Sequence, residues 1–235
     1  MKQITKTITS KLQTLSNAEK REIFPKFFKA GKGEYGEGDR FLGVIVPNVR
    51  AIAKQHKDIA LAEIQELIQS EWHEVRLCAL IIMVEKSKKK DEALRKELFD
   101  LYLSQTKHIN NWDLVDLSCR FIIGEYILDK SRDILYQLAQ SPLLWDNRIA
   151  IVSTYAFIRK GQLEDTYALS DLMMHHPHDL MHKAIGWMLR EAGKRDSKRL
   201  YDYVMSHRAD MPRTMLRYAI EKFSPTERST LMKRV

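Results

Sequence analysis

The chain has 235 residues, of which 44% are hydrophobic and 30% are charged, a balance typical of a globular protein and unlike that of a disordered chain. The longest apolar run, residues 77–84, is too short to cross a bilayer, and the first fifteen residues lack the apolar core of a signal peptide. The net charge of +8 favours an anionic partner, with nucleic acid first and an acidic membrane surface second, although a solvated basic surface gives the same total.

The first thirty residues predict one or two amphipathic helices, over residues 4–15 and 17–29. Pro25 lies inside the second range and is a candidate to break it. Residues 31–40 hold four of the nine glycines of the chain, which predicts a flexible surface loop or lid. This loop lacks the Gly-Lys-Ser/Thr ending of a nucleotide-binding P-loop.

Residues 41–47 resemble a strand, but the sequence contains no second run that could pair with them. We therefore expect an extended lead-in to a helix over residues 48–56, with Pro47 near its first turn. Asp58 is expected to cap the next helix, and Ser224 opens a capping box with proline at the first helical position. Between them the apolar pattern predicts helices over residues 58–69, 72–86, 91–103, 111–127, 131–140, 145–159, 163–175, 179–193, 196–206 and 213–222.

Similar segments recur along the chain when they are aligned on the polar residue that leads each apolar run. This column recurs every 32–40 residues and contains Arg76, Asp116, Arg148, Lys183 and Arg217. Helix pairs with this period predict an all-α fold, an α-solenoid of HEAT-like repeats in which the second helix of each pair lines a concave basic face. We expect one domain over residues 1–235, with the 31–40 loop in its N-terminal part.

The basic members of the column would form a stripe suited to a phosphate backbone. The alternative is that they join adjacent repeats through acids such as Glu74, Asp113 and Asp146. For any single residue the two interpretations carry similar weight, and for the column as a whole we favour nucleic acid.

Asp116 is the one acid in the column. A carboxylate facing DNA repels phosphate unless it serves chemistry or is neutralised, here by Arg148. Trp112 precedes Asp116 by four residues and shares its helix face. An aromatic wall beside a carboxylate suits a developing sugar cation. For Trp72 and Trp145 we prefer the simpler interpretation of repeat core.

The cysteines and the histidine cluster have neither a catalytic nor a metal-binding role in this interpretation. Cys78 and Cys119 lie in apolar helical runs, which predicts buried free thiols and a reducing cytoplasm. The histidines at 175, 176, 178 and 182 form a cluster, but the nearby acid, Asp179, is expected to cap the following helix, so we expect no metal site. No Ser–His–Asp or Cys–His pattern is found.

Three segments, Trp112–Asp116, Asn147–Ile151 and Lys183–Glu191, resemble the AlkD-like DNA alkylation repair glycosylases in order and spacing, and the resemblance extends from about Phe41 to Phe223. It implies a HEAT-like solenoid that excises cationic N3- and N7-alkylated purines from duplex DNA without a metal or cofactor, and without extruding the base. The motif positions imply the following catalytic set: Asp116 as the carboxylate, Trp112 and Trp187 against the lesion nucleotide, and Arg148 in the cleft.

The resemblance also implies an aromatic residue on an N-terminal helix that holds DNA. Here the glycine-rich loop, residues 31–38, takes that region, and Phe27 and Phe28 are the candidates. We therefore expect a monomeric alkylpurine DNA glycosylase of base excision repair, located in the cytoplasm with the nucleoid. The residues expected to contact DNA are Arg76, Lys183, Arg190 and Arg217.

Two other functions remain open. The first is a non-catalytic or weakly active DNA-binding HEAT-like protein that recognises damaged or branched DNA, which the loop at 31–38 favours. The second is a protein-interaction scaffold, which would predict an apolar concave face in place of a basic column.

Overall fold

The structure is a computed structural model that describes residues 3–233. The described chain is all-α, as predicted, and its one β-type contact is an isolated bridge between Arg40 and Trp72. No helix in residues 3–233 is long and apolar enough to cross a membrane. Backbone contacts divide the chain into two compact units, residues 1–126 and 127–235.

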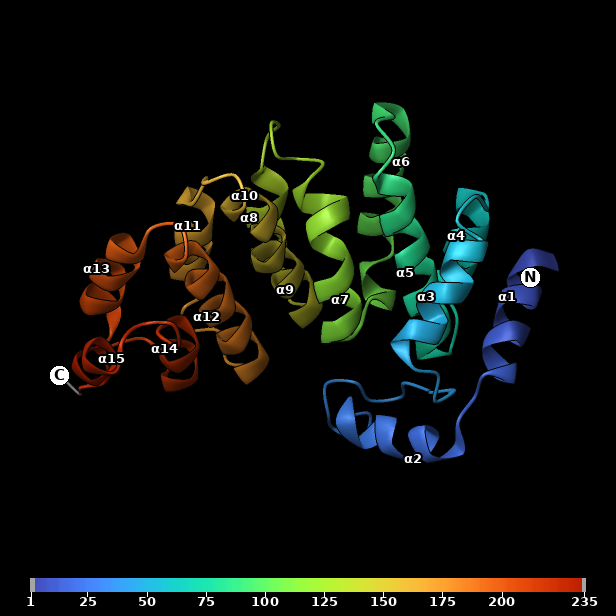
Figure 1. Ribbon diagram of the computed structural model, residues 1–235, viewed down its shortest axis with the longest axis horizontal. Helices are drawn as coiled ribbons and strands as arrows, with labels where there is room; N and C mark the ends of the chain where they lie inside the picture. The colour runs from blue at the N-terminus through green and yellow to red at the C-terminus, as the bar shows by residue number, and fades with distance from the viewer. Residues whose placement is uncertain (1–2, 234–235) are drawn as a thin grey trace. The chain divides into compact units, whose positions relative to one another are not determined.

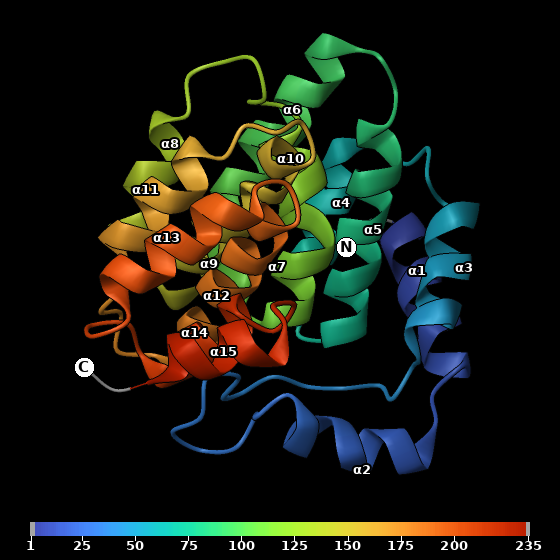
Figure 2. The same ribbon diagram turned by 60° about the vertical axis from the view of Figure 1, so that its left-hand side comes forward.

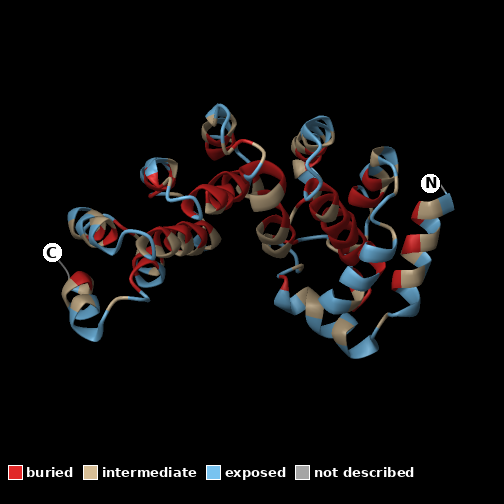
Figure 3. Ribbon diagram, turned by 45° about the horizontal axis from the view of Figure 1, so that its top comes forward, coloured by how far each residue is buried: buried red, intermediate tan, exposed pale blue. Residues whose placement is uncertain are grey.

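Helix α5 is the centre of the first unit and packs against α3, α4, α6 and α7 (Figure 1). All of its residues except Glu85 are buried (Figure 3), because neighbours cover it on every side. Helix α2 runs crosswise to α1 and α3 (Figures 1 and 2). The elements of this unit are α1 (Gln3–Thr14), α2 (Ala18–Phe27), α3 (Val46–Gln55), α4 (Leu61–Ile68), α5 (His73–Ser87), α6 (Glu92–Ser104), the 3₁₀ turn η1 (Thr106–His108), α7 (Trp112–Cys119) and the π-helical turn η2 (Arg120–Gly124).

Helix α12 has the same role in the second unit, where it packs against α9, α11, α13 and α14. Its approach to α14 is close, since a Cβ atom on Gly186 would lie 2.5 Å from the carbonyl oxygen of Met215. In both units successive helices pack in pairs, which is compatible with HEAT-like repeats. The elements of this unit are α8 (Asp133–Ala139), α9 (Leu144–Ser153), α10 (Tyr155–Ile158), α11 (Glu164–Leu172), α12 (Asp179–Gly193), α13 (Ser197–His207), α14 (Arg213–Ala219) and α15 (Pro225–Met232).

The helix ends test the capping predictions. The capping box of α15 is confirmed: the Ser224 hydroxyl accepts from the Glu227 N–H, and the Glu227 carboxylate accepts from the Ser224 N–H. The prediction for Asp58 is wrong, because α4 begins at Leu61 and the Glu63 carboxylate accepts from the Ala60 N–H at 2.8 Å. Pro25 does not break α2, since it lies in the last turn of that helix.

The prediction that Asp179 caps α12 is also wrong. Asp179 is the first residue of the helix, and the cap is His178, whose Nδ1 accepts from the Leu180 N–H at 3.1 Å. Cys78 and Cys119 are buried free thiols, as predicted, and burial raises the pKa of Cys78 to about 12.

Residues 41–45 form the lead-in to α3 that the sequence predicts, and their backbone pairs with a side chain instead of a strand. The buried Glu74 carboxylate accepts from the N–H groups of Leu42, Gly43 and Val44 at 2.9, 2.7 and 3.0 Å. Gly43 has a φ of 80°, and a Cβ atom there would lie 2.4 Å from the carbonyl oxygen of Asn17. Glu74 therefore satisfies three backbone donors that would otherwise be buried without a partner.

Candidate active site on helix α7

Helix α7 begins at a buried asparagine. The Asn111 Oδ1 accepts from the Trp112 N–H at 2.9 Å, and its Nδ2 donates to the carbonyl oxygen of Phe28 at 3.3 Å. Gly36 is buried beside it, where a Cβ atom would lie 3.1 Å from the Asn111 Nδ2. The end of α2 and the glycine-rich loop therefore both pack against the start of α7.

Trp112 and Asp116 lie one turn apart on α7, and both are half-buried. Between them, Leu114 and Val115 are fully buried and attach the opposite side of the helix to the core. The four-residue spacing thus places an aromatic ring and a carboxylate on the same accessible face.

The two candidate aromatics of the N-terminal region differ sharply in exposure. Phe27 is 58% exposed and Phe28 is 8% exposed. Both rings contact Trp112, with centroid distances of 5.8 and 5.6 Å, and Phe28 also stacks on Phe41. Phe27 is therefore the solvent-facing aromatic beside Trp112, whereas Phe28 belongs to the core. The glycine-rich loop follows this helix and does not replace it.

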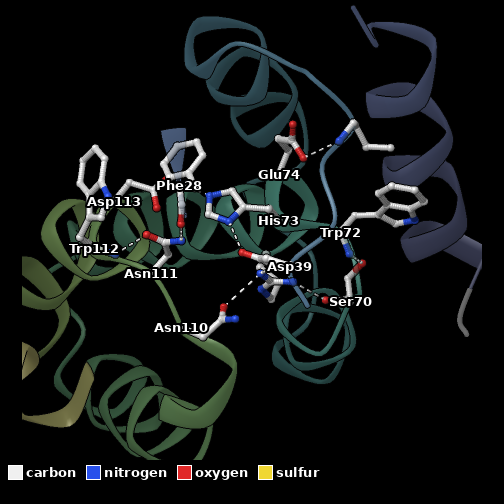
Figure 4. Close-up of polar contacts among 12 residues, drawn as sticks. Phe28, Asp39, Ser70, Trp72, His73, Glu74, Asn110, Asn111, Trp112 and Asp113 are labelled. Carbon is white, nitrogen blue, oxygen red and sulfur yellow. Dashed lines mark hydrogen bonds and ion pairs between the residues drawn. The ribbon is translucent and has the colours of Figure 1, made fainter. Parts of the chain in front are cut away.

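A buried histidine joins the first turn of α7 to the segment that leaves the glycine-rich loop. The His73 ring lies between Asp39 and Asp113 (Figure 4), with Nδ1 2.8 Å from the Asp39 Oδ2 and Nε2 2.8 Å from the Asp113 Oδ2. Arg76, one turn further along α5, pairs with the other Asp39 oxygen. Because both partners of the ring are carboxylates, both ring nitrogens must donate, which requires the imidazolium form.

The electrostatics of this cluster agree with its hydrogen bonding. Burial by itself would lower the pKa of His73, but Asp113 and then Asp39 outweigh burial and raise that pKa to about 9. Burial by itself would raise the pKa of Asp39, but His73 and Arg76 hold it below the usual value of 3.8. The charged forms of both groups are therefore favoured at neutral pH.

Arg76 was expected to contact DNA, and it is only 4% exposed. Besides Asp39, its guanidinium donates to the carbonyl oxygen of Ser70 at 2.8 Å and to the Asn110 Oδ1 at 3.0 Å. These contacts favour the repeat-joining alternative for this residue. The acid involved is Asp39, which no repeat pattern links to the column.

The second unit holds the other residues of the column. Arg148 on α9 is 5% exposed and donates to the carbonyl oxygen of Leu180 at 2.8 Å. Lys183 and Trp187 are four residues apart on α12 and half-buried, and Trp187 lies 6.4 Å from Tyr155 between ring centroids.

Three cations of this unit differ in their ion pairs. Lys183 pairs with Asp179 at 2.8 Å, which lowers the pKa of Asp179. Arg190 pairs with Glu221. Arg217 lies on α14, which packs against α12, and is exposed. Lys183 and Arg217 therefore keep accessible positive charge, whereas the Arg190 side chain is only 19% exposed.

Comparison with known proteins assigns the family. The family model described as DNA alkylation repair enzyme matches residues 8–223. The chain belongs to the DNA alkylation repair enzyme family. A solved structure titled "Predicted DNA alkylation repair enzyme from Enterococcus faecalis" is similar to this chain with a TM-score of 0.70 and 15% identity, covering 89% of this chain and 97% of that one. None of the curated proteins compared with the chain matches it.

The histidines of the cluster at residues 175–182 hydrogen-bond to the backbone and to Asn147. His176 Nδ1 accepts from the His178 N–H at 3.0 Å, and its Nε2 lies 3.1 Å from the Asn147 Oδ1. His182 Nε2 donates to the carbonyl oxygen of His176 at 2.6 Å. Within residues 3–233, no three His, Cys, Asp or Glu side chains come together as a metal site would require.

No pattern in the sequence marks His73 or Asp39 as part of a site. His73 stands one residue after a repeat tryptophan, where a polar residue reads as an ordinary helix start, and Asp39 closes a loop without periodicity. Their separation of 34 residues along the chain leaves no local pattern that pairs them. The one available signal was a histidine at the head of the helix that contains the longest apolar run, residues 77–84.

Proposed function

We propose that this family member is a monofunctional DNA glycosylase that hydrolyses the N-glycosidic bond of cationic N3- and N7-alkylated purines in duplex DNA. The observation that carries the proposal is the pairing of Trp112 and Asp116 on one accessible face of α7, in a chain of the DNA alkylation repair family. Base release by this route would begin base excision repair of alkylation damage.

The enzyme does not have to activate the leaving base, because the alkylated purine already carries a positive charge. An alkylated purine with a positive charge leaves as a neutral base with the bonding electron pair, and the positive charge moves to the deoxyribose as an oxocarbenium ion. Asp116 would stabilise that cation and orient the attacking water. Addition of the water at the anomeric carbon and loss of its proton give an abasic site. No acid has to protonate the leaving group.

The remaining roles follow the resemblance. Trp112 would shield the sugar from bulk water, with Phe27 beside it at the DNA surface. In the second unit, Trp187 and Arg148 would complete the catalytic set, and Lys183, Arg190 and Arg217 would contact phosphates. Arg76 would act chiefly through Asp39 inside the first unit.

The direct test measures release of N7-methylguanine and N3-methyladenine from methylated duplex DNA by the purified protein. Asp116→Asn keeps the shape of the side chain and removes its charge, so excision should slow by about 10²–10³-fold, the loss typical of one preorganised electrostatic partner. Affinity for undamaged DNA should hold or rise, because a carboxylate no longer repels phosphate. Asp100→Asn, on the exposed face of α6, is the matched control.

Three results would contradict the proposal. A folded Asp116→Asn protein that excises N7-methylguanine at the wild-type rate would remove Asp116 from the chemistry. Efficient release of the neutral base uracil would contradict a mechanism that depends on a charged leaving group. DNA binding without any base release would favour the alternative of a non-catalytic, damage-recognising protein.

A further inference from the structure

Four charged side chains form a buried network with no net charge inside the first unit. Asp39 lies at the end of the glycine-rich loop, His73 and Arg76 lie one turn apart on α5, and Asp113 lies in the first turn of α7. The side chains of Asp39, His73 and Arg76 are at most 5% exposed, and that of Asp113 is 14% exposed. Because removing one member leaves a buried charge unpaired, the network is costly to open.

The network connects two segments that carry residues of the proposed site. Asp113 directly follows Trp112, and Asp39 ends the loop that begins after α2 and Phe28. The Phe28 ring contacts the rings of both His73 and Trp112, with centroid distances of 4.8 and 5.6 Å. The His73 ring therefore bridges Asp39 and Asp113 through its nitrogens and also packs against the Phe28 ring (Figure 4).

We propose that His73 is a positioning residue for the proposed glycosylase reaction. Its two ring N–H groups join Asp113 in the first turn of α7 to Asp39 in the segment that follows α2. This link fixes the position of α7 and therefore of Trp112 and Asp116, which lie on it. This inference rests on the proposed function for its consequence in catalysis. It assigns a role to a residue outside the catalytic set, one that acts through α7 and touches no DNA.

The choice of residue type supports this role. An imidazolium presents two donors on opposite sides of a small rigid ring, which matches two carboxylates on different segments. Glutamine in its place has its N–H donors on one side and an acceptor oxygen on the other, so that oxygen would face one of the two carboxylates. The charged groups that face His73 are Asp39 from the loop and Asp113 from α7, and Arg76 on its own helix pairs with Asp39.

The test is a pair of complementary substitutions. His73→Gln should leave one of the two carboxylates against an amide oxygen, which weakens the link between the first turn of α7 and the loop. Adding Asp113→Asn should restore a donor facing that oxygen, so the double variant should recover part of what the single variant loses, as contacting residues do when they are energetically coupled. His207→Gln in the second unit, beside Asp171, is the matched control for loss of an acid-paired histidine.

Two readouts separate positioning from a general loss of stability, and both are taken where thermal melting shows the proteins folded. The first is the fluorescence of Trp112, obtained by subtracting the spectrum of the matching Trp112→Phe protein, which should shift in His73→Gln and return toward wild type in the double variant. The second is the single-turnover excision rate, which should fall by about 10–100-fold in His73→Gln, the scale expected from a small misplacement of catalytic groups.

The outcomes distinguish this inference from the proposed function. If the wild-type protein releases no alkylated purine, the proposed function fails, and the Trp112 signal still tests whether His73 positions α7. Unchanged fluorescence and rate in folded His73→Gln would overturn the inference, as would a double variant that recovers neither. If His73→Gln does not fold, nitrogen NMR of ¹⁵N-histidine-labelled wild type decides: both ring nitrogens of His73 must carry protons at pH 7, and one unprotonated nitrogen overturns it.

Discussion

The stability of the first unit should depend on pH through His73. Its pKa is raised from the ordinary value of 6.5 to about 9 in the folded protein, so folding favours the charged ring. The stabilisation is therefore complete below pH 6.5 and is lost as the pH rises through about 9. A shift of this size corresponds to roughly 3 kcal/mol.

The measurement is urea unfolding of wild type and His73→Gln at a series of pH values. The difference between the two free energies of unfolding isolates His73, because lysine and tyrosine titrations are common to both proteins. That difference should shrink by roughly 3 kcal/mol between pH 6 and pH 10. On the acid side, the lowered pKa of Asp39 stabilises the protein above pH 3.8, and this contribution is lost as the pH falls through the folded pKa of Asp39.

A difference that stays constant from pH 6 to pH 10 would refute the reasoning. It would mean that folding leaves the pKa of His73 at its ordinary value of 6.5, so the ring would be neutral above that pH and one of its two carboxylate contacts could not be a hydrogen bond there. A difference that grows with pH would reverse the sign and show that burial, which lowers the pKa of His73, dominates over the two aspartates.

Three further predictions concern other parts of the molecule. Glu74→Gln should destabilise the chain by about 3 kcal/mol in urea unfolding, because an amide cannot accept from three backbone donors, whereas Glu85→Gln on the same helix should change little. Lys183→Ala and Arg217→Ala should each flatten the log–log salt dependence of DNA binding by roughly one unit, and unchanged slopes would mean that neither meets phosphate. Phe27→Ala should leave the melting temperature almost unchanged, because the ring is 58% exposed, and should weaken binding to methylated duplex by roughly tenfold, about 1.4 kcal/mol; equal affinity would remove it from the DNA surface.

The sequence by itself determined the features that depend on near neighbours in the chain. The all-α class follows from apolar spacing, and the capping box at Ser224 joins groups only three residues apart. Burial of Cys78 and Cys119 follows from the apolar runs that contain them. The shared face of Trp112 and Asp116 needs only the helical period of 3.6 residues.

Only the tertiary structure decided which polar side chains are buried, and with what. Glu74, one of the acids that the alternative interpretation of the column placed between repeats, instead accepts from backbone groups about 30 residues away. Arg76 and Arg217 hold equivalent positions in the column, yet Arg76 is buried because Asp39 folds against it, whereas Arg217 is exposed. Periodicity states which side of a helix faces inward, whereas the charge that meets a residue there depends on a distant segment whose position no local interaction specifies.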